Sequence, residues 1–176
     1  WRRWWLQWFR RGSLVMEVRG EFVDYIKRVE NGAKLGYTDG FWFPHPSPEG
    51  GNDTIGYGHK LLDSEDWMKE GISDEENERL LYQDIFSASE NAAEVINEYG
   101  SDNFEDLPQH CQEIFTDFVF NLGGNGLRKF PKFVTAAVYG DMDGMRDEYK
   151  RYYRTPSGEV RELEDRNKEF YNLFLA

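Results

Sequence analysis

Apolar side chains at helical spacing divide much of this chain into amphipathic helices. Between residues 17 and 30 they recur every three or four positions, which predicts a single helix. The Asn31-Gly32 pair that follows tolerates the left-handed backbone of a C-cap and should end that helix. A long helix should begin after Ser73, because Ser73 and Glu76 have the spacing of a capping box. The apolar positions of the first helix are Val18, Phe22, Tyr25, Ile26 and Val29.

The second half of the chain is predicted to be helical as well. A helix should begin at Pro108, and the run FNLGGNG at residues 120–126 should stop it, because asparagine and glycine favour helix ends. Two short helices are expected at residues 131–139 and 142–153. After a turn in the sequence TPSG, residues 160–175 should form the closing helix.

Glycine and proline interrupt the helical pattern between these two parts. Strand-like pieces at Tyr37, residues 41–43 and residues 54–55 predict a small antiparallel sheet. The connecting residues 44–53 are stiffened by prolines and should rim a cleft. The predicted fold class is therefore α+β, mainly α.

Composition and motifs limit the classes of function that this chain can have. The four arginines of the first eleven residues leave 17 of the 21 Lys and Arg against all 33 acids, so the acidic body should not bind nucleic acid non-specifically. The single cysteine, Cys111, cannot form an internal disulfide, and we interpret it as a structural thiol. We expect no metal and no cofactor, because the chain has no phosphate-binding glycine loop, zinc-ligand spacing or GxSxG elbow.

The first eleven residues, WRRWWLQWFRR, have a different character. On a helix their aromatic rings share one face and their arginines lie on the other, as in interfacial antimicrobial peptides that bind anionic lipid. The segment is too short, and too interrupted by arginine, for a signal peptide or a membrane span. The membrane-active residues would be Trp1, Arg2, Arg3, Trp4, Trp5, Trp8, Phe9, Arg10 and Arg11.

The joint after this segment suggests an engineered fusion. Gly12-Ser13 has the composition of a linker or a cloning scar, and Met16 has the place of a native start. We therefore expect a cationic peptide and linker at residues 1–13 and a separate domain at residues 16–176. A natural N-terminal extension is the alternative.

Candidate chemistry lies between the first helix and the sheet. Glu30 is at the end of the helix, where the dipole disfavours a further negative charge and favours the protonated acid. A glycine-rich stretch with an aspartate and a threonine follows. Glu30 is thus a candidate general acid facing groups that could position a water molecule.

The order of these residues resembles a known family. Glu30, eight further residues, Asp39, and Thr54 at the head of TIGYGH are similar to the Glu/Asp/Thr signature of phage-type, T4-like lysozymes, the glycoside hydrolase family 24-like endolysins. That family usually has five residues between Asp and Thr, whereas fourteen intervene here, so either Asp39 or Asp53 is the counterpart. The pieces GISDEENERLLYQDI, FVFNLGGNG and LEDRNKEFYNLF follow in the family's order.

The resemblance implies a fold and an activity. The fold would be lysozyme-like, with a small β-hairpin lobe at about residues 20–72, a helical lobe at about residues 73–176, and a long helix joining them. The enzyme would be a muramidase that hydrolyses the β-1,4 bond between N-acetylmuramic acid and N-acetylglucosamine in peptidoglycan. Glu30 would be the acid, and Asp39 with Thr54 would hold the attacking water; Asp53 is the alternative.

The resemblance also suggests supporting residues. Tyr57 and Asn121 would contact substrate, although helix capping explains Asn121 equally well. His59 would be a structural residue paired to an acid. An arginine should lie near the catalytic glutamate, with Arg166 better placed in the pattern than Arg154 or Arg161.

The sequence also leads to expectations about where the protein acts and which other functions are possible. The parent would be a monomeric phage protein, made in the host cytoplasm without a signal peptide and acting on the periplasmic wall. The fusion would be applied from outside, with residues 1–11 contacting anionic lipid or lipopolysaccharide. The alternatives are a lytic transglycosylase, or a peptidoglycan-binding module whose killing is due to the N-terminal peptide.

Overall fold

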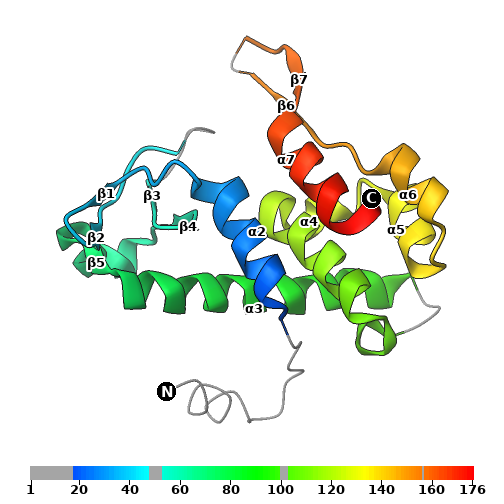
Figure 1. Ribbon diagram of the computed structural model, residues 1–176, viewed down its shortest axis with the longest axis horizontal. Coiled ribbons are helices and arrows are strands. Elements are labelled where there is room, and N and C mark those ends of the chain that lie inside the picture. Colours follow the sequence, from blue (N-terminus) through cyan, green and yellow to red (C-terminus); the bar gives the residue numbers. More distant parts are fainter. Residues whose placement is uncertain (1–17, 48–52, 100–102, 156) are drawn as a thin grey trace.

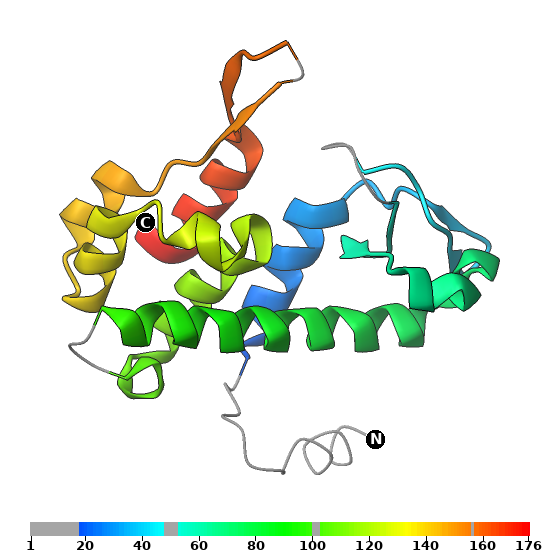
Figure 2. The ribbon, with the colours of Figure 1, turned by 180° about the vertical axis from the view of Figure 1, so that it is seen from behind.

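The computed structural model describes residues 18–47, 53–99, 103–155 and 157–176, and its fold is mainly helical with small sheets. Helix α3 (Asp74–Glu98) runs along one side of the molecule, with the small β lobe at one end and the other helices packed along the rest (Figures 1 and 2). This confirms the predicted α+β, mainly α class. None of the described helices is long and apolar enough to cross a membrane.

Helix α2 (Gly20–Asn31) is the helix predicted at residues 17–30. It ends at Asn31 as expected, but Gly32 has a φ of −60°, so the predicted left-handed C-cap is wrong. Gly32 instead supplies room, because a Cβ there would lie 2.7 Å from the carbonyl oxygen of Arg28. The buried side chains of α2 pack in the core of the helical lobe, not in the small lobe where the expected division placed them.

The small lobe holds two sheets. Strands β1 (Tyr37–Thr38), β2 (Phe41–Trp42) and β5 (Ile72–Ser73) form one antiparallel sheet; β3 (Thr54–Ile55) and β4 (His59–Lys60) form the other. The strand predictions at these positions are confirmed. Helix η1 (Asp63–Glu70) closes the lobe over Trp42, Ile55, Leu61, Met68, Ile72 and Leu80.

Helix α3 joins the two lobes. The Ser73 hydroxyl accepts a 3.2 Å hydrogen bond from the Glu76 backbone N–H, which confirms the predicted N-cap. Leu80 packs in the small-lobe core, whereas Leu81 and Ile85 pack in the larger core. One rigid element therefore carries both lobes.

The helical lobe contains the remaining elements. They are η2 (Phe104–Asp106), α4 (Gln109–Leu127), α5 (Pro131–Val138), α6 (Met142–Glu148), α7 (Glu164–Phe170) and η3 (Tyr171–Leu175). Helix α4 does not stop within FNLGGNG as predicted. Only Gly123 leaves the helical conformation, with φ 69° and ψ 169°, and the helix resumes to Leu127 as a kinked continuation.

A β-hairpin replaces parts of two predicted helices. Strands β6 (Tyr152–Arg154) and β7 (Val160–Glu162) pair antiparallel, so α6 ends at Glu148 and the closing helix begins only at Glu164. The turn predicted in TPSG connects the strands, with the Gly158 N–H donating to the Thr155 carbonyl at 2.8 Å. The residues on each side favour strands, because tyrosine and valine suit extended backbone.

Candidate active site

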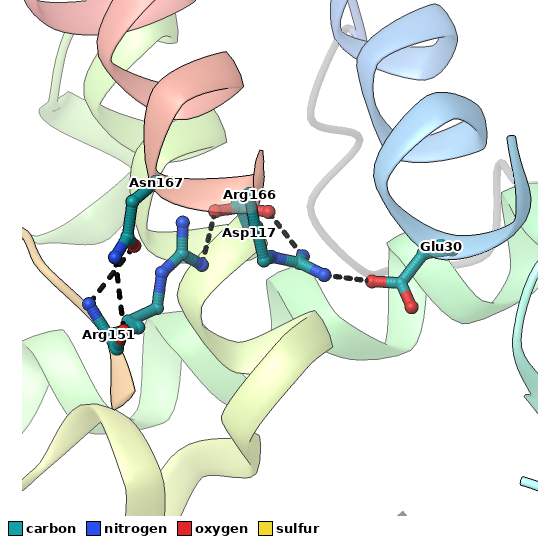
Figure 3. Close-up of polar contacts among 5 residues, drawn as sticks. All are labelled: Glu30, Asp117, Arg151, Arg166 and Asn167. Atoms are coloured by element: carbon teal, nitrogen blue, oxygen red, sulfur yellow. Dashed lines mark hydrogen bonds and ion pairs between the residues drawn. The ribbon is translucent and has the colours of Figure 1, made fainter. Parts of the chain in front are cut away.

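Glu30 lies in the last turn of α2 and points toward α7 (Figure 3). Arg166 Nη1 donates to Glu30 Oε1 at 2.5 Å. The Glu30 side chain keeps 18% of its surface exposed, so the carboxyl group is fixed yet reachable from solvent. Of the three arginines weighed from sequence, Arg166 is thus the one that contacts Glu30.

Arg166 is itself part of a buried chain of alternating charges. Its Nη2 donates to Asp117 Oδ1 at 2.6 Å, and Arg151 Nη1 donates to Asp117 Oδ2 at 2.7 Å. Asp117 and Arg151 are fully buried. Paired in this way the charges are tolerated, whereas removing one of them would leave an uncompensated buried charge.

The charges perturb one another strongly. Burial alone would raise the pKa of Asp117, but Arg151 and Arg166 outweigh it and hold that pKa below its usual value. Burial alone would lower the pKa of Arg166, but the charges of Asp117 and Glu30 raise it further. Both groups therefore stay ionised across the ordinary pH range.

Arg151 is anchored through both its side chain and its backbone. Its guanidinium lies 4.5 Å from the ring centroid of Phe118 and 4.9 Å from that of Phe170. Asn167 brackets its backbone, accepting from the Arg151 N–H at 3.0 Å and donating to the Arg151 carbonyl at 3.0 Å. The far end of the charge chain is therefore rigid.

The turn between β3 and β4 reaches Glu30 from the other side. Gly58 has a φ of 89°, and a Cβ there would lie 3.2 Å from Glu30 Oε2. Asn31 Nδ2 donates to the Gly56 carbonyl at 2.8 Å, which ties this turn to the end of α2. The glycines of TIGYGH thus bring backbone close to the carboxyl group, at a distance that leaves little room for a Cβ at Gly58.

Thr54 begins the strand that leads into this turn, and Asp53 directly precedes it. Thr54 is half-buried and pairs directly with His45, each N–H donating to the other's carbonyl at 2.9 Å. Asp53 is exposed, and its carbonyl accepts from Leu61 N–H at 3.0 Å, extending the β3–β4 ladder.

Asp39 has a structural role in a hairpin turn. Asp39 and Gly40 connect Thr38 to its partner Phe41, with φ values of 50° and 88°. Two central residues with positive φ define a type I′ turn, for which Asp-Gly is a favoured pair. Asp39 is exposed there, and the β1–β2 pair lies farther from α2 than β3 and β4 do (Figure 1).

The two expected substrate contacts lie in different lobes. The half-buried ring of Tyr57 packs 5.1 Å from the ring of Trp42, and burial raises the Tyr57 pKa. Asn121 precedes the Gly123 kink, and its buried Oδ1 has no hydrogen-bond partner among the residues that the structure describes. This buried acceptor is therefore unsatisfied among the described residues.

His59 lies between two acids, as its expected supporting role requires. Its Nδ1 is 2.9 Å from Asp84 Oδ2 on α3, and its Nε2 is 3.2 Å from Glu65 Oε2 on η1. The hydrogen bond to Asp84 is the main reason that the His59 pKa is raised. These contacts tie β4 to both neighbouring helices.

Sequence reasoning missed Asp117 and Arg151. An acid among the apolar positions of α4 was a visible signal, because Ile114, Phe115, Phe118 and Val119 surround Asp117 in the sequence. Arg151 gave no local signal. Arg154 and Arg161, by contrast, lie on the hairpin and contact Gly158 and Glu159.

Within the described part of the chain, no cluster of His, Cys, Asp or Glu side chains could hold a metal ion. The expected membrane-active segment, residues 1–11, lies outside the described residues.

Comparisons with known proteins identify a family and a fold. Residues 39–169 match the family model described as phage lysozyme. Among solved structures, the chain is similar to the muramidase domain of SpmX from Asticaccaulis excentricus, with a TM-score of 0.61 and 19% sequence identity, covering 92% of this chain and 99% of that chain. At this identity the likeness shows the fold alone. No curated protein matched.

Proposed function

This chain belongs to the phage lysozyme family, and we propose that Glu30 is the acid with which it cleaves the β-1,4 bond between N-acetylmuramic acid and N-acetylglucosamine. The chain is a lysozyme-type glycoside hydrolase acting on peptidoglycan. The observation that supports the role of Glu30 is its position: a partly exposed carboxyl group held between Arg166 and the glycine backbone of the β3–β4 turn.

The two carboxyl oxygens of Glu30 have different surroundings. Arg166 donates to Oε1, whereas Oε2 lies beside the backbone of Gly58. In this mechanism Oε2 carries the proton and delivers it to the leaving glycosidic oxygen. Glu30 becomes an anion as the bond breaks, and the guanidinium of Arg166 stabilises that developing charge in a fixed position.

The attacking water requires a second group on the opposite face of the sugar. In our proposal Asp39 holds this water with the help of Thr54, and Asp53 is the alternative. A separation of roughly 6.5–9.5 Å between the acid and base carboxyl groups leaves room for the water and would give inversion at the anomeric carbon. Tyr57 and the unpartnered Oδ1 of Asn121 would contact the sugars.

The decisive experiment removes the proton donor while keeping the shape of the site. Glu30→Gln preserves the size of the side chain and a hydrogen-bonding oxygen for Arg166, but an amide cannot act as the acid. We expect this variant to lose clearing of outer-membrane-stripped Gram-negative cells. Glu169→Gln is the matched control, because Glu169 is an exposed carboxylate paired to Arg28 at 3.2 Å. Near-normal clearing by Glu30→Gln would overturn the assignment.

Two rival functions give different products. A lytic transglycosylase would cleave the same bond without water and leave anhydro-muramic ends, which mass spectrometry of the products identifies. A peptidoglycan-binding module would sediment with the wall without clearing it. The proposed hydrolase instead releases reducing ends.

We also propose that residues 1–11 permeabilise membranes, in a fusion applied from outside to a phage-derived enzyme that normally acts on the periplasmic wall. The support is compositional: an acidic body is repelled by an anionic outer membrane, and a Trp/Arg segment offsets that repulsion. Deleting residues 1–13 should leave activity on bare peptidoglycan unchanged and weaken killing of intact cells. Equal killing would refute the membrane role.

A further inference from the structure

The β6–β7 hairpin projects from the helical body, and the mechanism above does not use it (Figures 1 and 2). Five of its six strand residues are exposed, and only Glu162 is half-buried. Both faces of the hairpin therefore meet solvent. A two-stranded hairpin of this kind is marginally stable alone, so its apolar side chains gain little from folding.

Aromatic and basic side chains occupy both faces. Tyr152, Tyr153 and Val160 are 51%, 42% and 57% exposed. Directly paired residues share a face, so Tyr152 lies with Glu162, and Arg154 with Val160, on one side. Tyr153 lies with its partner Arg161 on the other side. Each face thus presents one ring and one guanidinium.

The base of the hairpin is firmly anchored. The Leu163 N–H donates to the Arg151 carbonyl at 3.0 Å, and Asn167 Nδ2 donates to Glu162 Oε1 at 3.2 Å. Lys150 Nζ adds an ion pair to Glu162 at 3.3 Å. An exposed hairpin on a rigid base can hold a ligand in a defined place.

That base is continuous with the candidate active site. Strand β6 follows Arg151, whose side chain is linked through Asp117 and Arg166 to Glu30 (Figure 3). Strand β7 leads into α7, whose third residue is Arg166. The hairpin is therefore joined at both ends to the elements that position the proton donor.

The charge of the hairpin differs from that of the body. Residues 152–162 carry two arginines and two acids and are therefore neutral, whereas the whole chain has a formal net charge of −12. A substrate with sugar faces and peptide carboxylates complements tyrosine rings and guanidinium groups. In the free protein Arg161 pairs with Glu159 at 2.8 Å, an exposed contact that is weak enough to exchange.

We propose that one face of the β6–β7 hairpin binds the glycan strand beside the cleaved bond, with the tyrosine of that face against a sugar ring and the arginine of that face toward a stem-peptide carboxylate. The proposal rests on the proposed function, because it takes peptidoglycan as the substrate. The hairpin would then set affinity for the polymer without taking part in bond cleavage.

The first test measures binding to lipid-free sacculi by sedimentation, in a Glu30→Gln background that leaves the polymer intact. Replacing both Tyr152 and Tyr153 with Ser removes the ring from each face and should weaken binding about tenfold, the size expected when a stacking ring is lost. Tyr139→Ser is the matched control, because Tyr139 is 72% exposed and follows α5. It should bind normally. All variants keep residues 1–13, so any binding by that segment cancels.

The second test uses the active enzyme and separates polymer binding from bond cleavage. The double tyrosine variant should raise KM for sacculi about tenfold with kcat unchanged, while its hydrolysis of a short soluble substrate stays normal. Unchanged binding and KM would overturn the proposal. So would an equal loss on both substrates, since the hairpin would then act through Glu30. If the variants instead change only self-association in sedimentation velocity, the occupant is a second copy and the proposal fails.

The two proposals fail separately. If Glu30→Gln still hydrolyses sacculi, the assigned acid is wrong, but binding by the hairpin can still be measured in the cold. If Glu30→Gln is inactive and the hairpin variants bind normally, the acid stands and the hairpin proposal alone falls.

Discussion

Arg166 donates to Glu30 across 136 positions of sequence, and the 2.5 Å contact joins the end of α2 to the start of α7. The same guanidinium reaches Asp117 through its other terminal nitrogen at 2.6 Å. A planar group that serves two carboxylates fixes both the position and the orientation of Glu30.

Lysine cannot replace this geometry. Arg166→Lys keeps the positive charge but lacks the planar pair of donors, so it cannot serve Glu30 and Asp117 together. We expect kcat to fall roughly 10²-fold, the usual loss when a preorganised charge near the reacting group is removed, with KM little changed. Arg28→Lys, which alters an exposed pair with Glu169, is the control and should retain activity. Normal kcat in Arg166→Lys would show that the orientation of Glu30 does not matter.

Asp117 should be the most sensitive position of the charge chain for stability. Asp117→Asn leaves Arg151 and Arg166 buried without the anion that they share. We expect a loss of about 3–5 kcal/mol in the free energy of unfolding, measured with urea. Arg151→Met should cost less, because Asp117 keeps Arg166 and the replacement packs between Phe118 and Phe170. If Arg151→Met destabilised the protein more than Asp117→Asn, the main stabilising contribution would come from Arg151.

The approach of the β3–β4 turn to Glu30 Oε2 can be tightened directly. Gly58→Ala places a Cβ 3.2 Å from that oxygen, at a backbone φ of 89°. We expect activity to fall at least tenfold, together with a stability loss of roughly 1–2 kcal/mol from the left-handed backbone. Gly140→Ala separates the two effects, because Gly140 also has positive φ but nothing lies within 4 Å of its Cβ position. If both variants keep full activity on peptidoglycan, substrate does not enter beside Oε2.

Local sequence predicted the elements whose signals lie within a few residues. The amphipathic pattern of α2, the Ser73 N-cap and the strand pieces at Tyr37 and Thr54 were all found in this way. The charge chain was not, because Asp117 and Arg151 acquire their meaning only when α4 and the base of the hairpin pack together. Pairing between buried charges that are far apart in the chain produces no periodic pattern in the local sequence.

The β6–β7 hairpin was missed for a related reason. The residues before and after its turn fit a helical pattern nearly as well as a strand pattern, and the cross-strand pairing of Tyr153 with Arg161 spans the turn. Conversely, Arg166 was singled out only because a family resemblance supplied the expectation of an arginine near the acid. Composition alone would not have chosen it over Arg154 or Arg161.

Asparagine substitutions separate the two candidate water-holding acids. Asp39→Asn removes the carboxylate but preserves the type I′ turn, because asparagine also adopts positive φ there. If Asp39 is the base, this variant should lose activity roughly 10²–10⁴-fold while Asp53→Asn stays near normal. The opposite pattern assigns the role to Asp53. Thermal unfolding of both variants should match that of the parent, and a drop in Asp39→Asn would mean that the turn had been disturbed.

His59 should make stability depend on pH in the neutral to alkaline range. Its contacts with Asp84 and Glu65 raise the His59 pKa above the unfolded value of about 6.5. The folded state therefore binds the proton more tightly, and the resulting stabilisation is complete below about pH 6.5 and is lost as pH rises through the folded pKa.

Replacing the imidazole should remove that pH dependence. His59→Gln should lower the free energy of unfolding by roughly 1.5–3 kcal/mol at pH 6, where the charged hydrogen bonds to Asp84 and Glu65 are formed. The difference from the parent should shrink steadily toward pH 10 in urea titrations. His110→Gln is the control, because His110 touches only Cys111 at 3.3 Å among its described contacts and should show no such trend. A pH-independent difference for His59→Gln would mean that His59 supports β4 by packing alone and that its charge contributes nothing.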